Sequence, residues 1–389
     1  MNFIFYKNLN LIKIKWFIYL SVSISLMTIH FISGPISSPD TYNFSRLADF
    51  LINHNFDFYS YIIAQPTMKF YSVPVTIFAI AKVISKEYWE VIILALNSAC
   101  IPVIILLASR IVHLTKLNKY LAAFFPLIFL FSADYLIWAK YVLTDTIYSL
   151  LVIWCLYVVT LSLSKDNRGW KVNLIFIVSI LLLILSRPVY PPVVLVLCFF
   201  YFVPTHIIKS KHVISVLLIS VPIIFLAFTA LLKSNIPDTL NIEILKFSIG
   251  MIKDGVIIHD RPETYIVHNY DYVSIFKILC TRFLYFFAPY SNSFSMMHII
   301  INVIFFVIVA LPILISEIFV DRRQVKNHIA LQTKAILMSL IIATAVFHSM
   351  TLIDYDWRYR YPTIALMILL ATIEISLFLQ QKLSTSKES

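Results

Sequence analysis

Long apolar runs that contain few charged residues recur along the sequence and limit what the chain can fold into. A helix that crosses a lipid bilayer needs about 20 such residues. We place ten runs of about this length, near residues 16–33, 89–110, 120–139, 143–164, 171–186, 188–208, 212–232, 295–317, 330–352 and 361–380. The sequence therefore predicts an all-α, polytopic membrane protein with about ten transmembrane helices in a single domain that spans residues 1–389.

Composition supports this class and excludes two others. Of the 389 residues, 60% are hydrophobic and 13% are charged, which is too apolar for a soluble domain. The net charge of +11 would suit nucleic acid, but the basic residues lie in short clusters between apolar runs, as in the cytoplasmic loops of membrane proteins. We therefore expect no nucleic-acid partner. The four cysteines have no CxxC spacing, so they predict neither a zinc site nor a disulfide framework.

The distribution of basic residues orients the chain. Lys7, Lys13 and Lys15 precede the first run, which lacks the cleavage site of a signal peptide, so we expect an uncleaved first span with a cytoplasmic N-terminus. One further apolar run, 70–84, is short and is interrupted by a proline and a lysine. If it lies flat on the membrane, the later basic loops and the C-terminal tail share the cytoplasmic side. If it crosses, they move to the other side, against the positive-inside bias, so we prefer the flat alternative.

The flat alternative leaves two large loops on the outer side. The first, 34–88, would contain two interfacial helices, Asp40–Asn53 and Pro66–Ser85. The second is 233–294. Both termini are then cytoplasmic, and membrane lipids surround the spans.

Four cations do not follow the charge rule. Lys140, Arg187, Arg358 and Arg360 lie in short outer turns, where the positive-inside bias disfavours them. All four would lie near the depth of a lipid phosphate. An anionic group bound on the outer face would explain them.

Two of these arginines belong to the stretch Asp354–Pro362, a short group of charged and aromatic residues between two apolar runs. Asp354 and Asp356 could neutralise Arg358 and Arg360 in a local ion-pair network. The tyrosines and the tryptophan are typical of an aromatic belt at the membrane interface, and stacking against a sugar is the alternative. The stretch is therefore either neutralised by its own acids or part of a binding site.

Four short motifs share the predicted outer face. They are Ser38-Pro-Asp40-Thr-Tyr42, Tyr141-Val-Leu-Thr-Asp145, Leu185-Ser-Arg187-Pro188 and Arg358-Tyr-Arg-Tyr-Pro362. In this order and on this side, they resemble the GT-C superfamily of integral membrane glycosyltransferases, which includes protein mannosyltransferases and the aminoarabinose transferases of lipid A. The resemblance covers nearly the whole chain, by pattern and not by identity.

The resemblance implies an inverting glycosyltransferase of a bacterial inner or cell membrane. Such an enzyme moves a sugar from a polyprenyl-phosphate donor to a glycan, lipid or protein acceptor on the outer face. On the matching positions Asp40 is the catalytic carboxylate, and the substrate-binding residues are Arg187, Arg358, Arg360, Asp145, Lys140 and Tyr42. Where several family members have His-Pro-Pro or Glu-Lys-Pro, this chain has Gln65-Pro66 followed by Lys69. We therefore assign no metal ligand and no required cofactor, and leave a divalent cation as an open alternative.

Each assignment has a structural alternative. A carboxylate at Asp40 can take the proton of the acceptor, yet an aspartate here also suits the N-cap of the helix that follows. Arg187 presents a fork that suits a phosphate, but Arg187 and Lys140 can equally reach lipid headgroups. Asp145 either lines the site or favours the N-terminus of its own helix.

Two other functions are alternatives. A glycan polymerase or ligase that uses diphosphate-linked oligosaccharides would also need arginines and a large late loop on the outer side. A transporter or flippase for lipid-linked sugars would need ionisable residues along a path through the membrane, and charges in the middle of the predicted spans are scarce.

Overall fold

The computed structural model describes residues 2–65, 69–116, 119–164, 169–203, 210–233, 271–291, 294–320, 327–350 and 357–388. The regular structure of these residues is helical, and the only strand-like pairing among them is one bridge between Ile36 and Tyr141. The α-helices are α1 (Asn2–Ser33), α2 (Pro39–Asn53), α3 (Phe58–Ala64), α4 (Ser72–Ile84), α5 (Trp89–Leu114), α6 (Lys119–Phe124), α7 (Ala133–Ile137), α8 (Asp145–Leu163), α9 (Trp170–Ile184), α10 (Tyr190–Phe202), α11 (Ser210–Lys233), α13 (Tyr272–Phe286), α14 (Met296–Phe319), α15 (His328–Ser349) and α16 (Tyr361–Glu388). Four 3-10 helices join them: η1 (Lys69–Tyr71), η2 (Phe125–Phe131), η3 (Trp138–Lys140) and η5 (Trp357–Arg360). The all-α prediction is confirmed for this part of the chain.

Six helices of the described chain are long and apolar enough to cross a membrane. They are α1 from Ile12 onward, α5, α8, α14, α15 and α16 together with the turn before it. Three shorter apolar helices are α9, α10 and the Ile219–Ala230 part of α11. These lengths fit an integral membrane protein, and the count of about ten spans stays a prediction.

One predicted span, 120–139, is not a continuous helix. Its two halves, Tyr120–Phe131 and Ala133–Lys140, meet at an angle of 65°. Pro126 lies at the start of η2, where a proline removes a backbone donor, and the Ser132 hydroxyl accepts a hydrogen bond from Tyr135 N (3.4 Å) and begins α7. The break turns α7 into the protein interior.

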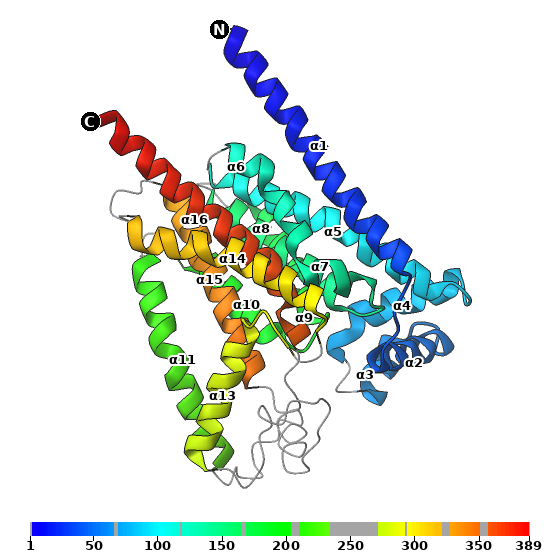
Figure 1. Ribbon diagram of the computed structural model, residues 1–389. Helices are drawn as coiled ribbons and strands as arrows, with labels where there is room; N and C mark the ends of the chain where they lie inside the picture. Colours follow the sequence, from blue (N-terminus) through cyan, green and yellow to red (C-terminus); the bar gives the residue numbers. More distant parts are fainter. Residues whose placement is uncertain are drawn as a thin grey trace.

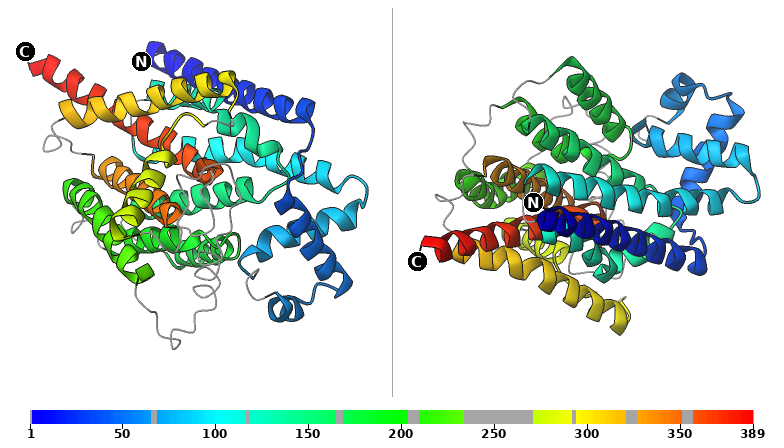
Figure 2. Two further views of the ribbon diagram at one scale, coloured as in Figure 1. Left: turned by 60° about the horizontal axis from the view of Figure 1, so that its bottom comes forward. Right: turned by 90° about the horizontal axis from the view of Figure 1, so that it is seen from above.

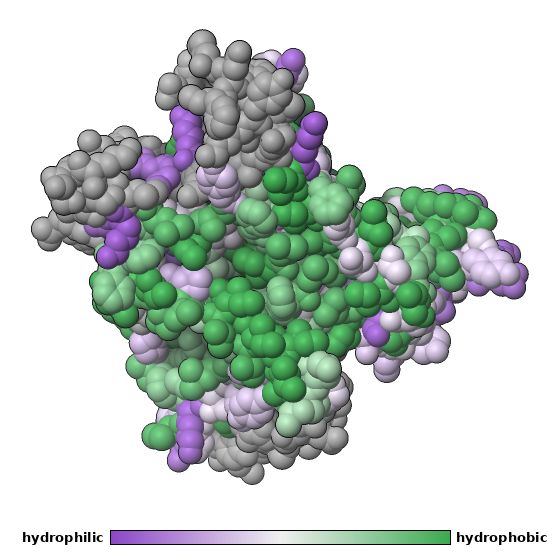
Figure 3. All heavy atoms as spheres, turned by 45° about the horizontal axis from the view of Figure 1, so that its top comes forward, coloured by the Kyte–Doolittle hydropathy of each residue, from purple (hydrophilic) through white to green (hydrophobic). Residues whose placement is uncertain are grey.

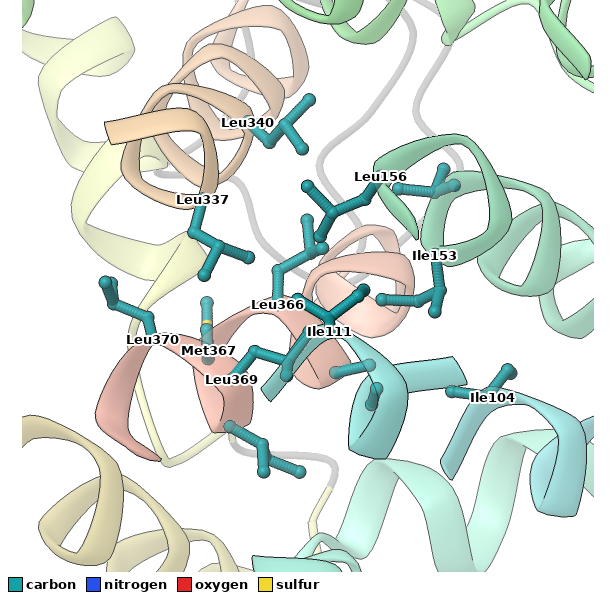
Figure 4. Close-up of a cluster of buried hydrophobic side chains, with 14 of the residues drawn as sticks. Ile104, Ile111, Ile153, Leu156, Leu337, Leu340, Leu366, Met367, Leu369 and Leu370 are labelled. Atoms are coloured by element: carbon teal, nitrogen blue, oxygen red, sulfur yellow. The ribbon is translucent and has the colours of Figure 1, made fainter. Parts of the chain in front are cut away.

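The bundle is built around α16. Of its span, 83% is buried, against 28% for α1 and 22% for α14. Figure 4 shows the core where α16 meets its neighbours, with Leu366 of α16 in one cluster with Leu156 of α8 and Leu337 of α15. Between helices in lipid, close packing of such side chains replaces the exclusion of water as the main attraction. α1 and α14 form part of the periphery, and hydrophobic residues cover most of the described part of the face seen in Figure 3.

Helices α2, α3 and α4 form a lobe with a core of its own. Phe44 and Leu47 of α2 pack against Val75 and Phe78 of α4. The lobe stands at the end of α1 that is far from the N-terminus, to one side of the bundle (Figures 1 and 2). The N-terminal end of α1 and the C-terminal end of α16 lie at the opposite end of the bundle (Figure 1). α2 thus agrees with the predicted helix Asp40–Asn53, and α4 covers the later part of the predicted helix Pro66–Ser85, while their interfacial position stays a prediction.

Two helices occur in regions where none was predicted. α3 lies inside the first predicted outer loop, and α13 lies at the end of the second, 233–294. α13 is capped by Asp271, whose carboxylate accepts a hydrogen bond from Ser274 N at 2.6 Å. Residues 234–270 of that loop lie outside the described residues.

A buried ionic network connects α14, α15 and α16. Lys334 forms ion pairs with Glu317 (2.8 Å) and with Glu374. The Ser316 hydroxyl donates to the second oxygen of Glu374 at 2.6 Å. Lys334 and Glu374 lie within two of the predicted spans, where a charge is costly unless it is paired.

Candidate active site

The loops that precede α2 and α8 are hydrogen-bonded to each other. Val142 N donates to the carbonyl of Ile36 at 3.0 Å, and the Thr41 hydroxyl donates to the carbonyl of Val142 at 2.8 Å. The Asn97 side chain of α5 donates to the same loop, at 3.1 Å from the carbonyl of residue 141. These bonds satisfy backbone groups that no helix serves. They hold the first turn of α2 beside the first turn of α8.

Asp40 lies in that first turn of α2 but does not cap the helix. Ser38 is the N-cap, and it forms a capping box with Thr41. The Asp40 side chain instead accepts a hydrogen bond from Arg358, with 2.6 Å between Oδ2 and Nη2. The structure therefore replaces the N-cap alternative for Asp40 with an ion pair to a residue near the other end of the chain.

A second ion pair joins Asp145 and Arg187. Asp145 is the first residue of α8, and Arg187 lies in the turn between α9 and α10. Both residues are buried, at 5% and 7% exposure. The turn is also bonded to the first loop, because Val73 N donates to the carbonyl of Leu185 at 3.0 Å. Arg187 thus faces a carboxylate inside the protein and not the lipid headgroups.

Tyr71 lies near enough to both ion pairs for their charges to act on it, and no sequence motif indicated it. The charges of Asp40, Asp145, Arg187 and Arg358 all act on its hydroxyl. Burial raises the pKa of Tyr71, the two carboxylates raise it further, and the two arginines lower it. These five residues come from five separate segments of the chain and form one group, which we call the Tyr71 cluster.

Arg360 points away from the Tyr71 cluster, although it is only two residues from Arg358. Its Nε donates to Asp134 Oδ2 at 2.9 Å, it donates to the carbonyl of Ala288, and its guanidinium lies 5.2 Å from the ring centre of Phe306. Arg360 is fully buried. Arg360 thus forms a buried ion pair with Asp134, and its role in substrate binding stays a prediction. Asp134 carries no signal of its own in the sequence, because it lies inside the apolar run 120–139 that predicts a continuous span.

Lys140 and Tyr42 do not join the cluster. Tyr42 is 67% exposed on α2, and Lys140 is half-buried in η3. Within the described part of the chain, neither side chain forms a hydrogen bond or an ion pair. Asp354 and Asp356, proposed as local partners of the arginines, lie outside the described residues.

The Tyr71 cluster pairs two acids with two arginines, so its formal charges cancel. An anion that enters the cluster can displace a carboxylate as the partner of an arginine, and this carboxylate can then accept a proton. The Asp40–Arg358 pair is the accessible one, with side-chain exposures of 43% and 18%. Arg187 retains one further donor, because its Nε is buried and has no acceptor among the described residues.

The described residues do not indicate a metal site. Among the described residues, no three His, Cys, Asp or Glu side chains come together to hold a metal ion. The divalent cation left open above stays a prediction.

No protein family, curated protein or solved structure matches the chain.

Proposed function

We propose that the protein is an inverting membrane glycosyltransferase that moves a sugar from a polyprenyl-phosphate donor to an acceptor on the outer face of the membrane. The observation that carries the proposal is the contact of 2.6 Å between Asp40 and Arg358, which joins a potential base to a potential phosphate-binding group. The buried pair of Asp145 and Arg187 lies beside it around Tyr71.

The reaction requires a base and a cation at one place. The acceptor hydroxyl gives its proton to the Asp40 carboxylate while its oxygen forms a bond to the anomeric carbon. The bond between that carbon and the phosphate oxygen breaks, and polyprenyl phosphate leaves with an additional negative charge. An arginine next to the leaving oxygen stabilises this charge, because a bidentate fork fits a phosphate well. Arg358 is in position to do this, and the buried Nε of Arg187 can donate to a second oxygen.

The positions of the two key residues along the chain support the outer face. Asp40 follows the end of α1 that is far from the N-terminus, and Arg358 precedes the end of α16 that is far from the C-terminus. Lys13, Lys15 and Lys382 lie toward the terminal ends of the same two helices. The positive-inside bias assigns the terminal ends to the cytoplasm and the Tyr71 cluster to the outer side.

The test is transfer in proteoliposomes supplied with a labelled pool of polyprenyl-phospho-sugars and an extract of acceptors. We expect Asp40→Asn to abolish transfer. Asp49→Asn is the matched control, because Asp49 is also an acid of α2 with a cationic partner, Lys82 at 2.7 Å, outside the cluster. Full transfer by Asp40→Asn would refute the assignment of the base.

A second candidate function is a polymerase or ligase that uses diphosphate-linked oligosaccharides. It is favoured by the presence of two arginines, Arg187 and Arg358, around one tyrosine, because a diphosphate offers two groups to bind. The donor separates the two functions. Activity with a diphosphate-linked oligosaccharide, and none with a monophosphate-linked sugar, would establish the second candidate. Flux of the lipid-linked sugar without formation of a glycosidic bond would instead indicate a transporter.

A further inference from the structure

The turn that carries Arg358 rests on an aromatic stack. Tyr359 lies between Arg358 and Arg360 in η5, and its ring stacks on the imidazole of His348, with ring centres 4.4 Å apart and planes at 12°. The ring of Phe286 is also nearly parallel to this imidazole, at 6.3 Å and 18°. His348 is 4% exposed. Tyr359 is thus attached to the protein interior.

The stack matters because of the geometry of a 3-10 helix. With three residues per turn, consecutive side chains leave the axis about 120° apart. Arg358, Tyr359 and Arg360 accordingly reach three different partners, which are Asp40, His348 and Asp134. A rotation of the turn about its axis would move all three side chains together. The stack of Tyr359 and the buried ion pair of Arg360 with Asp134 therefore both hold the rotation of η5 that turns Arg358 toward Asp40.

The end of α15 that carries His348 is anchored through its neighbour Ser349. The hydroxyl of the next residue, Ser349, donates to the carbonyl of Ala345 at 2.7 Å, and Arg282 of α13 donates to the carbonyl of Ser349 at 3.4 Å. Both α13 and α15 pack against η5. The imidazole of His348 therefore offers a fixed flat surface against which η5 packs.

We propose that His348 is a positioning residue. Together with the Arg360–Asp134 pair, its stack on Tyr359 holds the rotation of η5 that directs Arg358 to Asp40, where an anionic ligand would bind. The geometric part of this proposal stands without any assigned function. The part that concerns a phosphate ligand rests on the proposed function above.

The geometric part is tested by the reactivity of a thiol placed at position 358. Arg358→Cys is labelled with a water-soluble maleimide in three backgrounds: wild type at position 348, His348→Phe and His348→Leu. Phenylalanine keeps a flat ring for Tyr359, and leucine keeps bulk without the stack. We expect the labelling rate in His348→Leu to rise by about twofold to tenfold, the range set by the energy of a single aromatic stack, and to stay unchanged in His348→Phe. Protein without the added cysteine gives the background from the native thiols. Equal rates in the leucine and phenylalanine backgrounds would overturn the proposal.

The ligand part is tested by the binding of farnesyl phosphate to the protein in detergent. We expect His348→Leu to weaken binding by about twofold to tenfold and His348→Phe to leave it unchanged. If the wild-type protein binds no farnesyl phosphate while the labelling changes as expected, the proposed function fails and the positioning role stands. Unfolding temperatures identify a variant that does not fold. In that case Tyr359→Leu against Tyr359→Phe repeats the comparison from the half-buried side of the stack, and equal labelling of this second pair would overturn the proposal.

Discussion

Removal of the charge of Asp40 should tighten the binding of a phosphate ligand and at the same time abolish transfer. Without ligand, the Arg358 guanidinium donates to Asp40 at 2.6 Å, so a phosphate has to compete with the carboxylate for it. Asp40→Asn keeps the shape of the side chain and removes the charge. Helix α2 should persist in this variant, because Ser38 and not Asp40 is its N-cap.

The size of the effect follows from the exposure of the pair. The Asp40 and Arg358 side chains are 43% and 18% exposed, so water screens their attraction. Ion pairs in such surroundings contribute about 0.2–1 kcal/mol, and we place this one in the upper half of the range because Arg358 is largely buried. Since 1.4 kcal/mol is a factor of ten, the variant should bind the phosphate about threefold to fivefold more tightly. The lost repulsion between carboxylate and phosphate acts in the same direction.

The assay is calorimetric titration of the protein in detergent with farnesyl phosphate at low salt. Asp49→Asn is again the control, because it removes a charge from the same helix at an ion pair outside the Tyr71 cluster. We expect unchanged binding in the control, and a smaller difference between Asp40→Asn and wild type when salt is added. Unchanged or weaker binding by Asp40→Asn would refute the competition between carboxylate and phosphate.

Three further predictions concern the buried polar groups. Asp134→Asn leaves Arg360 buried without its charged partner and should lower the free energy of unfolding by about 3–5 kcal/mol, measured by thermal unfolding in detergent; a change below about 1 kcal/mol would contradict the interpretation of the pair as buried. Burial raises the pKa of Tyr71 above 10.0, so the folded state holds the hydroxyl proton of Tyr71 more tightly than the unfolded state does. The contribution of the protonated Tyr71 to stability is therefore present below pH 10 and is lost as the pH rises through the pKa of the folded state. The unfolding temperature of wild type should therefore fall above pH 10 relative to that of Tyr71→Phe, and parallel curves would contradict this. Lys334→Met removes two ion pairs, those to Glu317 and Glu374, whereas Glu374→Gln removes one, so the first should lower the unfolding temperature more than the second.

The lengths of the apolar runs predicted most of the helices, and the exceptions have physical reasons. The predicted run 120–139 is broken at Ser132, which caps a new helix. The sequence did not indicate this break, because a capping serine has the same composition as a single polar residue inside a span. α13 has only 15 residues and carries Lys277 and Arg282, so it fell below the length and apolarity expected of a span. The amphipathic pattern of α13 was the one sequence feature that could have predicted this helix.

The site could be predicted in part, from the side of the membrane on which its residues fall. Asp40, Asp145, Arg187 and Arg358 were assigned to one face from charge bias and motif order, and the structure brings them together around Tyr71. Which acid pairs with which arginine depends on tertiary contacts between distant segments, and no local pattern encodes that. Tyr71 lay in an apolar segment and carried no signal of its own.

The choice between Arg358 and Arg360 shows where reasoning from charge bias alone ends. Both were exceptions to the positive-inside bias, and both prove to have a distant carboxylate partner. The difference between them is burial: the Arg360–Asp134 pair is 0% and 2% exposed, whereas the Arg358–Asp40 pair is 18% and 43% exposed. A fully buried pair is costly to separate, since each charge left behind has no water to replace its partner. A partly hydrated pair can exchange one anion for another at little cost. Among the two arginines, Arg358 is therefore the one that can give up a carboxylate to meet a phosphate.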